Sequence, residues 1–157
     1  MRKLLIGVLA LAGAGCSAGS EVAAVDREVE RFHELAADRE IDRLYDQSSD
    51  EFKRAATPEQ FHALLEVIDE RLGDVRRANR RGWHVNYTNA GTVVTLTYDT
   101  QFERGRGTEE FVYRLDDGRA RLLGFHVNSD ALTQRRPNRE EAAQADAEVT
   151  IMRPAAE

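Results

Sequence analysis

The chain has a single cysteine, Cys16, and a thiol is the most reactive group that the sequence offers. A basic start at residues 2–3, an apolar run over residues 4–12 and small residues at 13–15 lead directly into it. This order is the anatomy of a secretory signal peptide, and the run is too short to cross about 30 Å of hydrocarbon as a helix. An exposed, unpaired thiol is a liability in an oxidising compartment, whereas an acylated sulfur is chemically closed.

The stretch that ends at Cys16 resembles a bacterial lipoprotein signal. The resemblance implies removal of a signal peptide over residues 1–15 and lipidation of Cys16 with acyl chains such as palmitate; two or more chains anchor a protein stably. Such signals usually carry Leu three residues before the cysteine, where this chain has Gly13. Ser17 follows the cysteine, which implies a periplasm-facing position on the outer membrane of a two-membrane bacterium. The alternative is ordinary secretory cleavage after Ala12 or Ala14.

Four arginines concentrate positive charge between the helical and the strand-like parts of the sequence: Arg76, Arg77, Arg80 and Arg81. Such a cluster can bind anionic lipid headgroups or a phosphate, in which case binding weakens steeply with salt. A solvated connector between helix and sheet is the simpler interpretation.

The four histidines, His33, His62, His84 and His126, do not have the spacing of a metal site. Neither predicted helix that carries a histidine has a second histidine four residues away, as the H-E-x-x-H motif requires. In the sheet predicted below, His84 and His126 lie three strand spacings apart, roughly 14 Å, whereas two ligands of one zinc ion each lie about 2 Å from it. We expect no metal and no other cofactor, and histidines that are solvated or lie at edges.

Composition limits the class of protein that carries these residues. The chain has 157 residues, 41% hydrophobic and 32% charged, with a net charge of −6. These values fit one small domain and exclude collagen-like or wholly disordered chains. The single cysteine excludes an internal disulfide framework, and the acidic balance argues against a general nucleic-acid binder.

Helical periodicity dominates the first half of the mature chain. Apolar residues at helical spacing predict an amphipathic helix over residues 21–37, followed by a short helix near residues 41–45. Ser48, with Glu51 three residues later, has the form of a capping box for another short helix. Thr57 is predicted to cap a helix with Pro58 at its first position, and Gly73 to stop it.

The periodicity changes to two at Trp83. Alternating residues predict strands over 83–88, 93–102, 110–115 and 122–127. The turns expected between them are Asn89-Ala90-Gly91, Gly105-Arg106-Gly107 and Asp117-Gly118, and turns this short require antiparallel pairing. We therefore predict an α+β fold, with N-terminal helices packed on a curved four-stranded antiparallel meander over residues 22–130. Residues 16–21 are expected to be a lipidated linker, and residues 131–157 a flexible polar tail.

Several short motifs occur in an order that resembles bacterial domain-of-unknown-function families 4019 and 3887, over roughly residues 25–130. They are Leu44-Tyr45-Asp46, Thr57-Pro58-Glu59-Gln60-Phe61, Leu72-Gly73, Thr97-Tyr98-Asp99-Thr100-Gln101-Phe102, Glu110 with Val112, Asp117-Gly118 and Gly124-Phe125. The chain departs from the family at Ala120, where an aromatic residue is usual. The resemblance implies a nuclear transport factor 2-like, cystatin-like fold with a bent sheet around a helix, and it brings no catalytic residues.

Enzymes of that superfamily hold acid and base groups in an apolar cone between helix and sheet. The residues that could serve here are Tyr45, Asp46, Tyr87, Asp99 and His126, with Asp99 or His126 as the base and a tyrosine as the donor. Strand alternation, however, places Asp99 on the polar face. No Ser-His-Asp or Cys-His arrangement can be assembled, and the 105–107 stretch lacks the length and the following helix of a phosphate-binding loop.

Two hypotheses follow. The first is a cell-envelope lipoprotein whose domain binds a protein or ligand without catalysis, its membrane contact made by the lipid anchor and its oligomeric state open. The alternative is a secreted cone-fold enzyme or small-ligand-binding protein with an apolar pocket between helix and sheet. A pocket of roughly 300 Å³ or more into which Asp99 or His126 points would favour the alternative, whereas a solid interior would favour the first.

Overall fold

The structure is a computed structural model and describes residues 17–116 and 118–133. Helices come first and strands second, which confirms the predicted α+β arrangement. The elements are α1 (Ser17–Ala37), α2 (Ile41–Gln47), α3 (Asp50–Ala55), α4 (Pro58–Leu72), β1 (Val75–Thr88), β2 (Gly91–Phe102), β3 (Gly105–Asp116), β4 (Arg119–Asn128) and α5 (Asp130–Thr133). The predicted signal peptide, Cys16 and most of the predicted tail lie outside the described residues.

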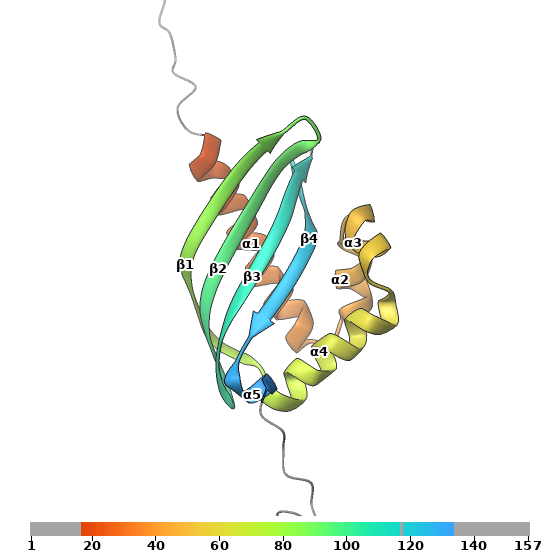
Figure 1. Cartoon of the computed structure of the whole chain (residues 1–157), viewed down its shortest axis with the longest axis vertical. Coiled ribbons are helices and arrows are strands. Elements are labelled where there is room, and N and C mark those ends of the chain that lie inside the picture. The colour runs from red at the N-terminus through yellow and green to blue at the C-terminus, as the bar shows by residue number, and fades with distance from the viewer. Residues whose placement is uncertain (1–16, 117, 134–157) are drawn as a thin grey trace, which may run out of the picture.

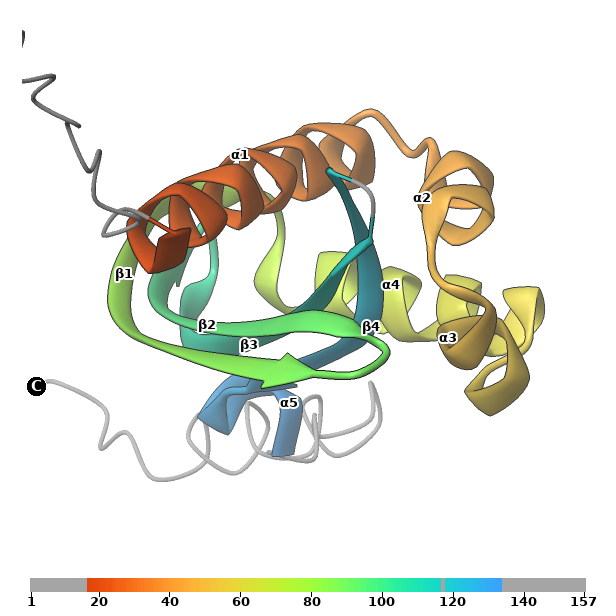
Figure 2. The same cartoon turned by 90° about the horizontal axis from the view of Figure 1, so that it is seen from above.

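Helix α1 covers the concave face of the sheet (Figures 1 and 2). Its apolar stripe is buried along its whole length, as the spacing predicted: Val22, Val25, Val29, Phe32 and Leu35. The helix begins at Ser17 rather than at residue 21, so the prediction of a linker over these residues was wrong. Ser17, Ala18 and Ser20 are compatible with a helix and only Gly19 opposes it, so these small residues extend α1 by one turn.

The helix caps were predicted with mixed success. Thr57 and Gln60 form both arms of a capping box at α4, with Pro58 in the first turn, and Gly73 ends the helix at φ 73°. At α3 the cap is Ser49, whose hydroxyl accepts a hydrogen bond from the Phe52 amide at 3.1 Å. The predicted cap, Ser48, instead donates to the Leu44 carbonyl in α2 at 2.8 Å. Two adjacent serines serve two different helices, which sequence spacing alone does not resolve.

The four strands form one antiparallel sheet in the order β1-β2-β3-β4, as predicted. Strand β1 begins at Val75 rather than at Trp83, so the arginine stretch is part of the sheet and not a connector. Its register shifts between Val75 and Arg77 and again between Arg80 and Gly82. Such irregularities interrupt the two-residue alternation, which is why the pattern became visible only after the second one.

The turn between β2 and β3 lies at residues 103–104, not at the predicted Gly105-Arg106-Gly107, which belongs to β3. A Cβ atom at Gly107 would lie 2.9 Å from the Asn128 carbonyl oxygen of β4, so this glycine allows close packing of the chain rather than a turn. Strand β3 ends at Asp116 and β4 starts at Arg119, as the Asp-Gly pair predicted.

The core joins α1, α4 and the sheet through aromatic side chains. The ring of Phe32 lies 5.1 Å from that of Phe111 and 4.9 Å from that of Phe125, and Phe52 packs edge-on to Phe61 at 5.2 Å. Helices α2, α3 and α4 gather beyond the β4 edge, where the Ser49 amide donates to the Leu122 carbonyl at 2.9 Å (Figure 2). Within the described residues, no helix is both long and apolar enough to cross a bilayer.

Candidate functional site

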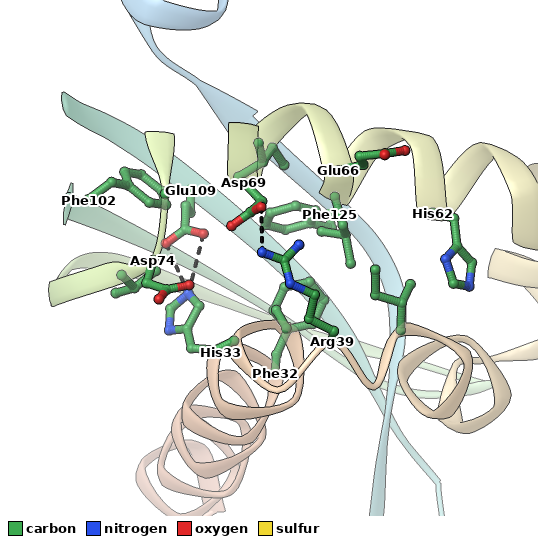
Figure 3. A pocket seen from close by; sticks show the side chains of 17 residues that line it. Phe32, His33, Arg39, His62, Glu66, Asp69, Asp74, Phe102, Glu109 and Phe125 are labelled. Carbon is green, nitrogen blue, oxygen red and sulfur yellow. Dashed lines mark hydrogen bonds and ion pairs between the residues drawn. The ribbon is translucent and has the colours of Figure 1, made fainter. Parts of the chain in front are cut away.

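A cavity of about 320 Å³ lies between the last turns of α1, one side of α4 and the adjoining end of the sheet (Figure 3). Apolar side chains form most of its wall: Phe32, Ile41, Leu65, Ile68, Phe102 and Phe125. Three small residues leave space in the lining: Ala36 and Ala37 in the last turn of α1, and Gly73 at the end of α4. The interior between helix and sheet is therefore hollow at this end.

The carboxylate of Glu109 lies in this wall and is almost fully buried, with 2% of the residue exposed. His33 Nε2 lies 3.0 Å from Glu109 Oε2 and 3.3 Å from Oε1, and the Thr100 hydroxyl donates to Oε2 at 2.5 Å. Among the residues that the structure describes, Glu109 is the one buried residue with a charged side chain. A buried carboxylate requires such hydrogen-bond donors, so His33 and Thr100 account for its presence.

Packing fixes the imidazole of His33. Its ring makes edge contacts with Phe32 and Phe111, with centroids 6.2 and 5.5 Å away. Because Nε2 faces a carboxylate, it carries a proton and donates it toward Glu109 in either charge state of the ring.

Arg39 and three carboxylates surround the mouth of the cavity. Arg39 follows α1 in the left-handed conformation, with φ 61°, at a position where glycine is usual. Its guanidinium lies 2.7 Å from Asp69 of α4. The hydrogen bond and the charge of Asp69 raise the pKa of Arg39, and the charges of Asp74 and Glu66 raise it further. One cation is thus surrounded by three anions, and the mouth is net negative.

His62, also in the lining, lies on α4 and interacts away from Glu109. Its Nε2 atom is 2.7 Å from Asp42 of α2, and both side chains are exposed. Among the described residues, no group of three histidine, cysteine, aspartate or glutamate side chains is arranged to hold a metal ion.

The acid–base residues nominated from the sequence do not line this cavity. Asp99 is exposed on the polar face of β2, as its alternation predicted, with its carboxylate 3.7 Å from Arg81. His126 is exposed on β4, and Tyr87 is 58% exposed on β1. Tyr45 donates to the Ala56 carbonyl at 2.9 Å, and the adjacent Asp46 is exposed. The structure therefore does not bring these five residues together.

Sequence analysis missed the pair that the structure does bring together, His33 and Glu109. Glu109 lies two residues before Phe111, so extending the alternation of β3 backward places it on the core face. His33 lies four residues after Val29 and beside the buried stripe of α1. Both signals were present. The predicted strand, however, began at residue 110, and the prediction for the helix considered only the apolar residues of the stripe and not the positions beside it.

Each of the four arginines predicted as an anion site has a polar partner on the protein. Arg76 lies 2.5 Å from Glu103, Arg80 contacts Asp26 and Arg81 lies 3.7 Å from Asp99. Arg77 donates to the Asn79 side chain at 3.2 Å. The carboxylates offset much of the local positive charge, and anion binding by this cluster stays a prediction.

The sequence matches a family described as "Protein of unknown function (DUF4019)" over residues 28–125, which include the second half of α1, all of α2 through β3 and most of β4. The match confirms the predicted resemblance to family 4019. No curated protein matches the sequence. The matched segment spans His33, Glu109 and the helices and strands that form the cavity, and it exceeds half of the chain, so the protein belongs to the DUF4019 family.

Proposed function

We propose that this protein binds a small, largely apolar molecule in the cavity between α1, α4 and the sheet, without catalysis. The observation that carries the proposal is the cavity itself, about 320 Å³ in volume and walled mainly by aromatic and aliphatic side chains. Ligand sites typically occupy about 300–1,000 Å³ and combine apolar walls with a few placed polar groups. Glu109 and its partner His33 supply the polar groups here.

Of the two hypotheses drawn from the sequence, the cavity favours the alternative, in its form as a small-ligand-binding protein rather than as an enzyme. The interior is hollow at one end, which supports a small ligand over a purely protein-binding surface. Asp99 and His126, nominated as bases, lie outside the cavity. The bent sheet with a helix on its concave face supports the proposed relationship to the nuclear transport factor 2-like, cystatin-like superfamily.

The proposal includes a lipid anchor at Cys16 and an extracytoplasmic location. Helix α1 begins at Ser17, directly after the proposed lipidated residue, and lining residues such as Ala36 belong to its last turn. A helix rises about 1.5 Å per residue, so the cavity mouth would lie on the order of 30 Å from the acylated end. That distance is sufficient to hold the binding site clear of the membrane surface, accessible to molecules in the periplasm.

The anchor is tested by metabolic labelling with a radioactive lipid precursor. The wild-type protein is expected to incorporate label, and Cys16→Ala is expected to incorporate none. Equal labelling of both proteins, or absence of label from the wild type, rejects the anchor.

Ligand binding is tested with a neutral apolar fluorophore such as 1-aminoanthracene. We expect its emission to rise on addition of the wild-type protein. Ala36→Phe places a ring in the cavity and should abolish the increase, whereas Ala63→Phe adds the same ring on an exposed part of α4 and should preserve it. No increase with the wild type, or equal increases with both variants, contradicts the proposed binding site.

A further inference from the structure

We infer that the ligand carries a positively charged nitrogen, so that the cavity selects organic ammonium compounds with a hydrocarbon body. This inference rests on the proposed function and names the chemical class that the site takes. It is carried by three features of the cavity: the charge of its lining, the incomplete hydrogen bonding of Glu109 and the position of its aromatic rings.

The lining of the cavity is net negative. It contains four carboxylates, Glu66, Asp69, Asp74 and Glu109, but only one guanidinium, that of Arg39. The two imidazoles in the lining do not reverse the sign, because the total stays negative even when both are protonated. An anionic ligand would meet repulsion in this partly desolvated space, whereas a cation would be attracted.

One carboxylate oxygen of Glu109 can accept a further hydrogen bond. Its Oε2 atom accepts from Thr100 at 2.5 Å and lies 3.0 Å from His33 Nε2, but Oε1 has only the longer 3.3 Å contact with the same nitrogen. A carboxylate oxygen can accept two hydrogen bonds. An N–H group that carries a positive charge would give Oε1 a second donor and would have the charge opposite to that of the carboxylate.

Aromatic rings line the cavity beside this carboxylate (Figure 3). Phe32 and Phe125 lie with their ring centroids 4.9 Å apart, and Phe102 contributes a third ring to the wall. Aromatic faces attract cations, more strongly where water is excluded, and they also accept a hydrocarbon chain. The combination of aromatic walls and one buried carboxylate is suited to an alkyl or aryl ammonium group.

Arg39 does not cancel this preference. Its guanidinium is bound to Asp69 at 2.7 Å and lies within the field of Asp74 and Glu66. The side chain is 65% exposed, so its own charge is also screened by water. The mouth therefore presents excess negative charge toward an entering molecule.

The test compares three probes of one chain length: n-hexylammonium, n-hexanol and n-hexanoate, each measured at pH 7.5 by displacement of 1-aminoanthracene. A charge-assisted hydrogen bond contributes about 1.5–3 kcal/mol, which corresponds to roughly 10- to 100-fold in affinity. We expect the ammonium to bind at least about 10-fold more tightly than the alcohol, and the carboxylate to bind weakest. Glu109→Gln should lower the affinity for the ammonium at least about fivefold relative to the alcohol, leaving the smaller attraction of the carboxylates at the mouth.

Glu110→Gln is the matched control, because Glu110 is the next residue of β3 and is exposed. This variant should keep the full preference for the ammonium. Asp74→Asn, at the exposed mouth, provides a test that does not disturb the core, and it should weaken the ammonium about two- to threefold without affecting the alcohol. Asp46→Asn, an exposed carboxylate outside the lining, should change neither affinity.

The outcomes separate this inference from the proposed function. Equal affinities of the wild type for ammonium and alcohol would overturn the inference and leave a neutral apolar site. An undiminished preference in folded Glu109→Gln would also overturn it, as would an unchanged ammonium affinity in Asp74→Asn if Glu109→Gln does not fold. Failure of every probe and of the fluorophore to bind would instead refute the proposed function.

Discussion

The space between helix and sheet differs at its two ends. Near the β1–β2 hairpin, α1 and the sheet meet through Val22, Val25, Val94 and Leu96, all buried. Near α4, the same two layers enclose a cavity of about 320 Å³, and the core-facing positions include the polar side chain of Glu109. The same elements thus build a filled end and a hollow end.

This difference separates stability from binding within one small domain. The filled end buries β-branched and aliphatic side chains without a charged group, which is the arrangement that stabilises a fold most efficiently. The hollow end gives up packing and retains a buried carboxylate that an apolar residue could replace. A buried ion or ion pair seldom stabilises a protein more than well-packed hydrophobic residues do, so its presence favours a role in binding.

The same substitution at each end tests the difference in packing most directly. Leu96→Ala removes a fully buried side chain from the filled end and should lower the free energy of unfolding by about 3–4 kcal/mol, because a new void forms. Leu65→Ala, whose side chain already borders the cavity, should cost about 2 kcal/mol or less, because fewer packing contacts are lost. Urea denaturation measures both, and a larger loss for Leu65→Ala would contradict the distinction.

His33 and Glu109 provide a second test at the hollow end. His33→Ala should lower the free energy of unfolding by about 2 kcal/mol, because it leaves the buried carboxylate with Thr100 as its one remaining described donor. The double variant His33→Leu/Glu109→Leu should regain this loss, since it removes the charge and adds apolar volume. It should also strongly reduce the preference for ammonium ligands.

Urea denaturation of His33→Ala and of the double variant measures their free energies of unfolding. A double variant that is less stable than His33→Ala would show that the pair contributes mainly to stability. Its interpretation as a binding feature would then fail.

The filled end was largely predictable from the sequence. The stripe of α1 and the alternation of β2 use regular periods, 3.6 and 2, and both predicted the buried faces confirmed by Val29 and Leu96. The caps of α4 were predictable for a similar reason, since a capping box and a terminal glycine act within a few residues. Local rules therefore sufficed where the structure is regular.

The hollow end was not predictable in the same way. The pair of His33 and Glu109 joins residues 76 positions apart, and no local pattern links a histidine on a helix to a glutamate on a strand. The irregular register of β1 hid the first half of that strand, and Gly107 resembled a turn residue although it serves close packing. Cavities form where regular packing stops, so sequence periodicity carries little information about them.

Helix α4 forms one wall of the cavity, and its N-terminal cap offers a third test. Thr57 accepts from the Gln60 amide at 3.3 Å, and the Gln60 side chain accepts from the Thr57 amide at 2.9 Å. Thr57→Ala removes one arm of this box and should lower the free energy of unfolding by about 1–2 kcal/mol. Thr57→Ser keeps the hydroxyl and should cost much less. A similar loss for both variants would show that the cap is not the source of the effect.

Tyr98 provides the test with the smallest effect, at the edge of the filled end, where its hydroxyl donates to Asp26 of α1 at 2.5 Å. Burial raises the pKa of Tyr98, and the hydrogen bond to Asp26 raises it further, so the folded protein retains the phenolic proton well above the ordinary pKa of about 10. The stabilisation is therefore complete below pH 10 and is lost above it, because the unfolded chain releases the proton first.

Near pH 8, Tyr98→Phe should lower the free energy of unfolding by about 1 kcal/mol through loss of the hydrogen bond. Between pH 8 and 11 the wild type should lose about 1.4 kcal/mol more than the variant, because the unfolded chain releases the phenolic proton progressively around and above its pKa of about 10. The stabilities should then cross between pH 10 and 11. Burial also raises the pKa of Tyr113, but that tyrosine is present in both proteins and does not affect the difference. Urea denaturation from pH 8 to 11 measures the crossing, and a constant gap would mean that the Tyr98 hydroxyl titrates alike in both states, as it would if α1 were not packed over this part of the sheet.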